Sequence, residues 1–81
     1  MNVSTQTSTR YFVLSGHGGG WLIFREGNDQ ALHRIGHKTL AMETAKVMAR
    51  ETAPSEVLVE QRNGSVQIQY EFPAPAEDET K

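Results

Sequence analysis

The dipeptide Asn63-Gly64 constrains the fold of this 81-residue chain more than any other feature of its sequence. It separates two segments, 57–62 and 65–70, in which apolar and polar residues alternate. Both central residues of a type I′ turn need positive φ, and Asn-Gly meets that need well. The dipeptide therefore predicts an antiparallel β-hairpin near the C-terminus.

A two-residue loop sets the register of this hairpin. It pairs Arg62 with Ser65 and Gln61 with Val66, and further along Val59 with Ile68 and Val57 with Tyr70. One face then carries the apolar set Val57, Val59, Val66, Ile68 and Tyr70. The other face carries Glu60, Arg62, Ser65, Gln67 and Gln69. One buried face and one solvent-exposed face are typical of a hairpin packed on a helix. Leu58 is isolated on the polar face, either as an ordinary exposed leucine or as part of a dimer or partner contact.

Residues 38–52 have the apolar spacing of an amphipathic helix. One face carries small and apolar side chains at helical intervals, namely Ala41, Ala45, Met48, Ala49 and Thr52. The helix begins after His37 or Thr39, and Thr39 is the better N-cap by chemistry. Pro54 cannot continue the helix and ends it.

Two short apolar runs near the N-terminus, 11–14 and 21–25, predict strands, because they are rich in aromatic and β-branched residues. A third strand over 31–36 is a weaker prediction, since its alternation is imperfect. The order β-β-(β)-α-β-β predicts an α+β fold in which one helix covers one face of an antiparallel sheet.

The two ends of the chain are poor in apolar residues. Residues 1–9 are mostly Ser, Thr, Asn and Gln, and residues 73–81 combine two prolines with three acids. Such segments bury too little apolar surface to offset the entropy of ordering, so both are predicted to be disordered tails. A single domain over 10–72 is small for an independent core, which favours a homodimer.

Composition excludes several classes of protein. The chain has no cysteine, which rules out disulfides and thiolate zinc sites. No segment has the length and apolarity of a signal peptide or membrane span, so a cytoplasmic protein without a membrane contact is expected. The net charge of −2 gives no electrostatic reason to expect nucleic acid.

The glycine-rich stretch 16–20 matches the HGGG string of lipases, but no catalytic set accompanies it. An oxyanion hole works beside a nucleophilic serine, and the chain has no G-x-S-x-G elbow. Phosphate-binding loops open onto a helix, whereas these glycines lead into a predicted strand. Metal binding by His17, His33 and His37 would need a convergence that the spacing does not predict. We therefore expect a hairpin loop, no enzyme activity, no cofactor and no metal.

Two kinds of function remain. The first is a homodimeric protein-interaction domain. The alternative is a nucleic-acid-binding or regulatory domain using the sheet face, although its basic residues are dispersed. The candidate interaction residues are Trp21, Arg25, Arg34, Leu58 and Arg62.

Four features of the sequence occur together: a Tyr-x-Val opening at Tyr11, a Gly-Trp strand start at Gly20-Trp21, an Ala-spaced helix, and an Arg-Asn-Gly hairpin. In these features the chain resembles, over roughly residues 10–70, the bacterial domain-of-unknown-function family DUF2188. Three positions depart from the family pattern: His37 stands where a Thr precedes the helix, Asn63 replaces Asp, and Ser65 replaces a basic residue. The resemblance implies a small bacterial or phage α+β domain and brings no catalytic residues.

Overall fold

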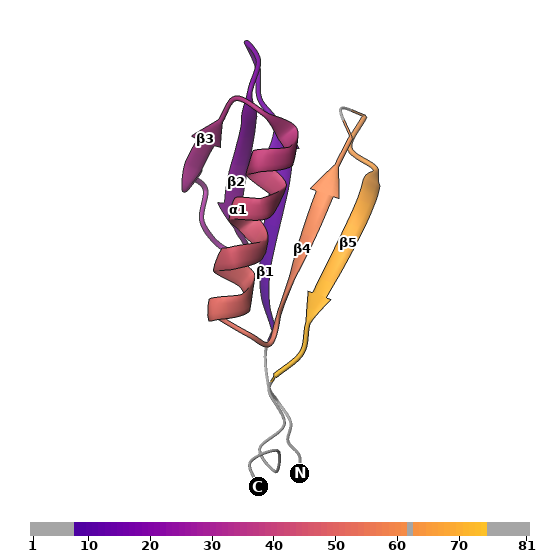
Figure 1. Cartoon of the computed structure of the whole chain (residues 1–81). Coiled ribbons are helices and arrows are strands. Elements are labelled where there is room, and N and C mark those ends of the chain that lie inside the picture. The colour runs from indigo at the N-terminus through magenta and orange to yellow at the C-terminus, as the bar shows by residue number, and fades with distance from the viewer. Residues whose placement is uncertain (1–7, 62, 75–81) are drawn as a thin grey trace, which may run out of the picture.

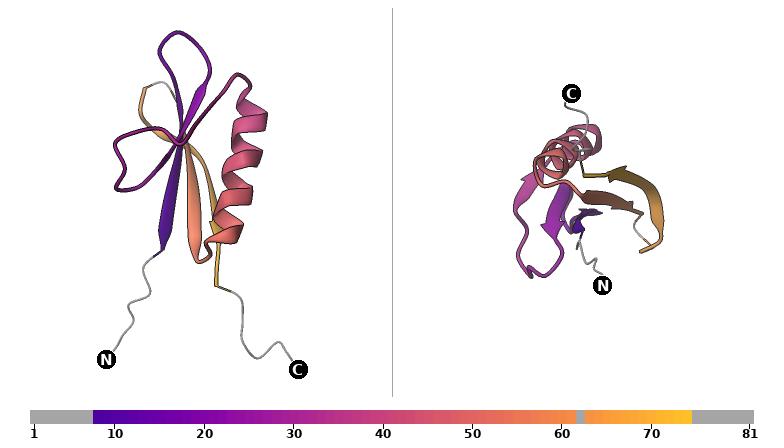
Figure 2. Two further views of the ribbon diagram at one scale, coloured as in Figure 1. Left: turned by 90° about the vertical axis from the view of Figure 1, so that its left-hand side faces the viewer. Right: turned by 90° about the horizontal axis from the view of Figure 1, so that it is seen from below.

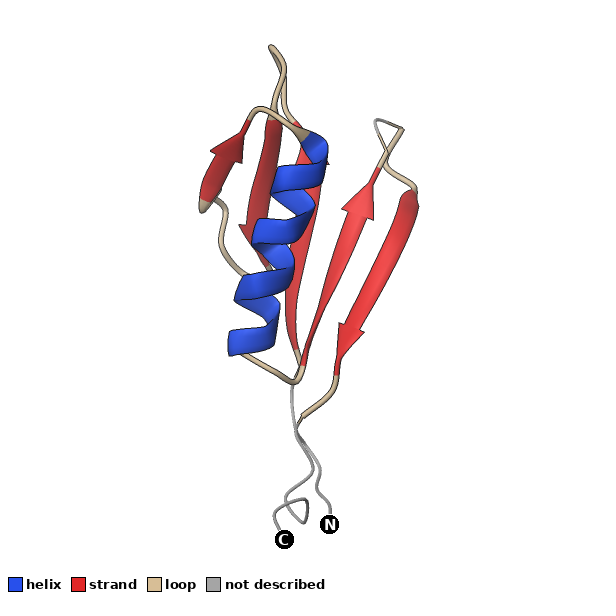
Figure 3. Cartoon of the chain, viewed as in Figure 1, coloured by secondary structure: helices blue, strands red, loops and turns tan. Residues whose placement is uncertain are grey.

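The computed structural model describes residues 8–61 and 63–74, and it has the α+β fold expected from the sequence. Figures 1 and 3 show one helix lying against one face of a sheet. The elements in chain order are β1 (Thr9–Ser15), β2 (Trp21–Arg25), β3 (His33–Ile35), α1 (Lys38–Glu51), β4 (Ser55–Glu60) and β5 (Val66–Phe72). Residues 31–36 thus do contain a strand, of three residues.

The sheet is mixed rather than fully antiparallel, which corrects the sequence prediction. Its strand order is β3-β2-β1-β4-β5, and β4 runs parallel to β1 while all other neighbours are antiparallel. Parallel strands need a long crossover connection, and α1 supplies it by carrying the chain from β3 back over the sheet to β4. The parallel pair places the C-terminal hairpin directly beside β1.

The core lies between α1 and the three central strands. The helix presents Ala41, Ala45 and Ala49, all fully buried, as the sequence predicted. Their small side chains allow α1 to approach the sheet closely. The sheet contributes five buried apolar residues, namely Tyr11, Val13, Ile23, Val57 and Val59.

The two ends of α1 are capped in different ways. His37 is the N-cap and makes no side-chain cap hydrogen bond, while Thr39 lies inside the helix. At the C-terminal end the buried Ser55 hydroxyl donates to the carbonyl of Ala49, and the Thr52 hydroxyl donates to the carbonyl of Met48 at 3.0 Å. These bonds satisfy carbonyls that have no partner within the helix.

The hairpin register is confirmed for Val57 with Tyr70 and Val59 with Ile68, but it changes near the turn. Val66 pairs with Glu60 across a bulge, so the predicted pair of Gln61 with Val66 is wrong. Val66 is 50% exposed instead of sharing the buried face.

The turn itself explains this difference. Gly64 has φ of 90°, whereas none of the described non-glycine residues, including Asn63, has positive φ. The amide of Gly64 donates to the carbonyl of Gln61, and the amide of Gln61 donates to the carbonyl of Ser65, both at 2.9 Å. Asn63 instead accepts hydrogen bonds from the amide and hydroxyl of Ser65. One left-handed glycine in a longer loop replaces the expected type I′ turn. The predicted pair of Arg62 with Ser65 involves a residue outside the described ones.

The predicted tails, 1–9 and 73–81, fall mostly outside the described residues, and β1 already begins at Thr9. Among the described residues, no helix is long and apolar enough to cross a membrane.

Candidate interaction surface

The sheet has one face covered by α1 and one face that no described element covers (Figure 2). Side chains alternate between the faces along each strand. On β1, Tyr11 and Val13 point into the core under α1, so Phe12 and Leu14 lie on the opposite face. The same alternation places Leu22 and Phe24 opposite the buried Ile23.

The uncovered face carries five large apolar side chains in adjacent rows. Cross-strand pairing aligns Phe24 with Phe12 and Phe12 with Leu58, while Leu14 pairs with Leu22. We call these five residues the apolar patch, and each of them is half-buried. Between this patch and the turn 25–28 lies a hollow of about 230 Å³ lined by Phe12, Leu14 and Phe24.

A row of charged residues borders the apolar patch. Arg10 lies beside Glu56 across the parallel strands, and its Nε donates to the Glu56 carboxylate at 2.6 Å. Its Nη1 contacts the Glu26 carboxylate at 3.2 Å, and Gln69 donates to the other Glu56 oxygen at 2.8 Å. The hydrogen bond to Glu56, with the charge of Glu26, raises the pKa of Arg10 above its usual value. With Glu71 paired beside Glu56, this border has three carboxylates and one guanidinium.

Arg34 on β3 holds the glycine loop that precedes β2. Its Nη2 donates to the carbonyl of Gly19 at 2.8 Å and to that of His17 at 3.3 Å. Gly18 and Gly20 both have φ of 81°, and Gly19 has φ of 98°. Three consecutive residues therefore adopt a backbone that other L-residues rarely adopt. The stretch is a loop joining two strands, as predicted, and its carbonyls accept hydrogen bonds from the guanidinium.

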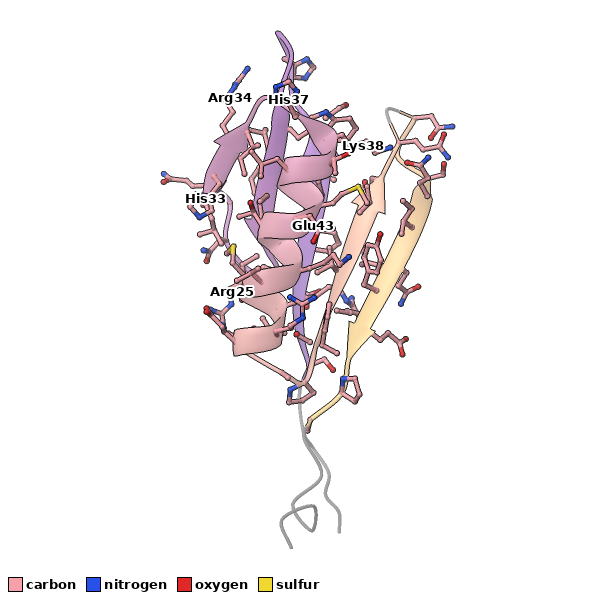
Figure 4. The ribbon with its side chains drawn as sticks, in the orientation of Figure 1. Arg25, His33, Arg34, His37, Lys38 and Glu43 are labelled. Carbon is pink, nitrogen blue, oxygen red and sulfur yellow. The ribbon has the colours of Figure 1, made fainter. Side chains whose placement is uncertain are left out.

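Two of the sequence candidates lie on the helix side of the sheet. Trp21 is half-buried beside the core, and Lys38 Nζ lies 5.2 Å from its ring centroid. Arg25 shares the helix side with Ile23 by alternation, and it is exposed near the last turns of α1 (Figure 4).

The five candidate residues therefore do not form one surface. Leu58 belongs to the apolar patch, and Arg34 lies at its edge as the cross-strand partner of Leu22. Trp21 and Arg25 are on the helix side. Arg62 lies outside the described residues.

The histidines are placed on separate elements. His33 lies on the edge strand β3 and His37 at the start of α1 (Figure 4). Within residues 8–61 and 63–74, no three His, Asp or Glu side chains are arranged to hold a metal ion.

Sequence reasoning missed four members of the apolar patch: Phe12, Leu14, Leu22 and Phe24. A signal was present, because the runs Tyr11–Leu14 and Trp21–Phe24 are continuously apolar rather than alternating. Continuous runs indicate strands with apolar side chains on both faces. Leu58 seemed isolated because its neighbour Phe12 comes from the parallel pairing of β1 with β4.

Comparison with known proteins places the chain in a family. Residues 11–72 match the model of DUF2188, described as an uncharacterized protein conserved in bacteria. The chain belongs to DUF2188. Its matched region includes the helix and all five strands except the first two residues of β1, so the bounds of the DUF2188 match nearly coincide with those of the fold. No curated protein and no solved structure matched the chain.

Proposed function

We propose that this DUF2188 protein is a small non-enzymatic interaction domain that acts as a homodimer and binds a partner protein through its uncovered sheet face. The observation that carries the proposal is the apolar patch. Exposed contiguous apolar surface is costly in water and marks interaction sites in soluble proteins. A partly exposed cluster of two phenylalanines and three leucines is also typical of the centre of a protein interface.

The charged border indicates the chemistry of the partner. Three carboxylates, from Glu26, Glu56 and Glu71, are offset by the single guanidinium of Arg10. A partner that presents apolar side chains flanked by lysine or arginine fits this surface, because charge complementarity at the rim speeds association and orients the complex.

Nucleic-acid binding through the same face has less support. The border is acidic overall, and the guanidinium of Arg34 is already bonded to loop carbonyls. Trp21 and Arg25 lie on the other face. A gel-shift series at low salt separates the two functions, since a nucleic-acid-binding domain would retain DNA or RNA with a steep salt dependence.

The proposal is tested by matched leucine substitutions on two surfaces. Leu58→Lys places a charge in the apolar patch, whereas Leu40→Lys makes the same change on the outer side of α1, where the leucine is 55% exposed. We expect Leu58→Lys to lose a polypeptide that copurifies with wild type from a bacterial host, and Leu40→Lys to retain it. Leu22→Lys provides a second variant on the patch, and circular dichroism checks that each variant is folded. Equal retention by all variants would contradict the proposal.

A further inference from the structure

The two edges of the sheet differ in length and exposure. β3 forms one edge with only three residues, while β5 forms the other with seven. Within the described residues, β5 pairs with β4 alone, so its outer edge has no strand partner. An edge of this length presents a row of backbone donors and acceptors to which another strand can add.

β5 lacks the features with which proteins protect an exposed edge. Such edges usually carry proline, lysine or a charge pointing toward the core. The strand Val66–Phe72 contains no proline, glycine or lysine, and Glu71 is its one charged residue. The bulge opposite Glu60 affects only the start of the strand.

The apolar side chains of β5 are also incompletely covered. None of its residues is fully buried, although Ile68, Tyr70 and Phe72 pack against the edge of the core. The helix reaches this strand through long cationic side chains: Lys46 Nζ lies 4.4 Å from the Tyr70 ring centroid, and the Arg50 guanidinium lies 5.5 Å from that of Phe72. The edge therefore has both unpaired backbone and apolar surface available.

We propose that two copies of this chain pair along β5 in antiparallel orientation, about a two-fold axis perpendicular to the sheet that passes midway between the two copies of Gln69. This inference rests on the homodimer of the proposed function and adds the surface that joins the copies. It leaves the apolar patch free for the partner protein.

The register follows from the strand itself. Gln69 is the middle residue of Val66–Phe72, so a two-fold axis between its two copies aligns the regular part of the strand, residues 68–70, with itself, and the bulge near Gln67 lies outside that part. Ile68 then lies opposite Tyr70 of the second copy, and both are apolar residues that pack against the core. Glu71 lies opposite Gln67, so no like charges meet, and cross-strand apolar pairs stabilise such a ladder. A self-complementary contact of this kind is expected at a two-fold interface.

Single cysteines test this register, because the natural chain has none. Directly opposed Cα atoms in antiparallel strands are about 4.5–5.5 Å apart, which permits a disulfide. In the proposed dimer Gln69→Cys brings two thiols face to face. Gln67→Cys is the matched control on an exposed position of the same strand, because its two copies would be four residues out of register, about 13 Å apart along the strand. Leu58→Cys monitors pairing through the uncovered face.

We expect wild type to elute at twice its 9.0 kDa mass in size exclusion with light scattering. On mild oxidation we expect Gln69→Cys to form a covalent dimer on the order of ten-fold faster than Gln67→Cys, because only the former meets disulfide geometry. A dimeric wild type in which Leu58→Cys cross-links and Gln69→Cys does not would overturn the β5 interface while leaving the homodimer intact. A monomeric wild type at high concentration would remove the homodimer and the β5 pairing together. Partner binding through the apolar patch would then be tested only by copurification with Leu58→Lys and Leu22→Lys.

Discussion

The two faces of the sheet are built from neighbouring residues of the same strands, yet they differ in what covers them. The helix side holds fully buried residues packed against three alanines of α1. The opposite side holds equally apolar residues, among them Phe12 and Leu58, that are only partly buried. Hydrophobic side chains on the first face are explained by folding. Those on the second face keep part of their surface exposed after folding, and our proposal assigns that exposed surface to a partner protein.

Truncation of adjacent residues that point to opposite faces should show the largest difference between the two sides of the sheet. Ile23→Ala removes a fully buried side chain and should destabilise the fold by about 2–5 kcal/mol. Leu22→Ala removes a side chain that is only partly buried and should cost about 1 kcal/mol, because less buried apolar area is lost. Urea denaturation of both variants measures the difference. Equal losses would mean that the uncovered face contributes as much to folding as the core does.

The close approach of α1 supports a second, smaller prediction. Ala45→Leu adds volume where the helix contacts the sheet and should cost about 1–3 kcal/mol through overpacking. Val47→Leu is the control on the same helix, where Val47 is 48% exposed, and its effect should stay within about 0.5 kcal/mol. Thermal unfolding followed by circular dichroism compares the two. A neutral Ala45→Leu variant would show that the helix side is not tightly packed.

The glycine loop gives the smallest expected effect. Gly19→Ala places a side chain at φ of 98°, which should cost about 1–2 kcal/mol through backbone strain alone, since no atom lies near the added Cβ. Gly36→Ala is the control, because a Cβ at Gly36 also meets no atom within 4 Å but the residue does not have a positive φ. This variant should leave the stability of the fold unchanged or raise it by about 0.4–1 kcal/mol. Chemical denaturation separates them. Identical stabilities of the two variants would indicate that the loop bonded to Arg34 does not require the positive φ at Gly19.

Local patterns in the sequence predicted most of the elements. The alanine spacing identified the buried face of α1, and a loop at Asn63-Gly64 gave the register that is observed at Val57 and Val59. The turn was misjudged because Asn63 can bind Ser65 through its side chain, which competes with the left-handed backbone of a type I′ turn. Local chemistry alone does not decide between these two uses of asparagine.

The interaction surface could not be assembled from the sequence because it depends on a long-range pairing. Phe12 and Leu58 are 46 residues apart, and they become neighbours only through the parallel contact of β1 with β4. Within its own hairpin Leu58 shares a face with polar residues, so the hairpin pattern alone predicted an isolated leucine. The continuous apolar runs of β1 and β2 contained the remaining information, since such runs indicate strands with two apolar faces.

Site-specific photo-crosslinking in a bacterial host tests the central claim most directly. A photoreactive residue is placed at Leu58 on the uncovered face and, in a matched variant, at Leu40 on the outer side of α1. We expect one dominant adduct with another polypeptide from position 58, absent from position 40 and lost when Leu22→Lys is added. Comparable adducts from both positions, or none from position 58, would contradict the assignment of the uncovered face to partner binding.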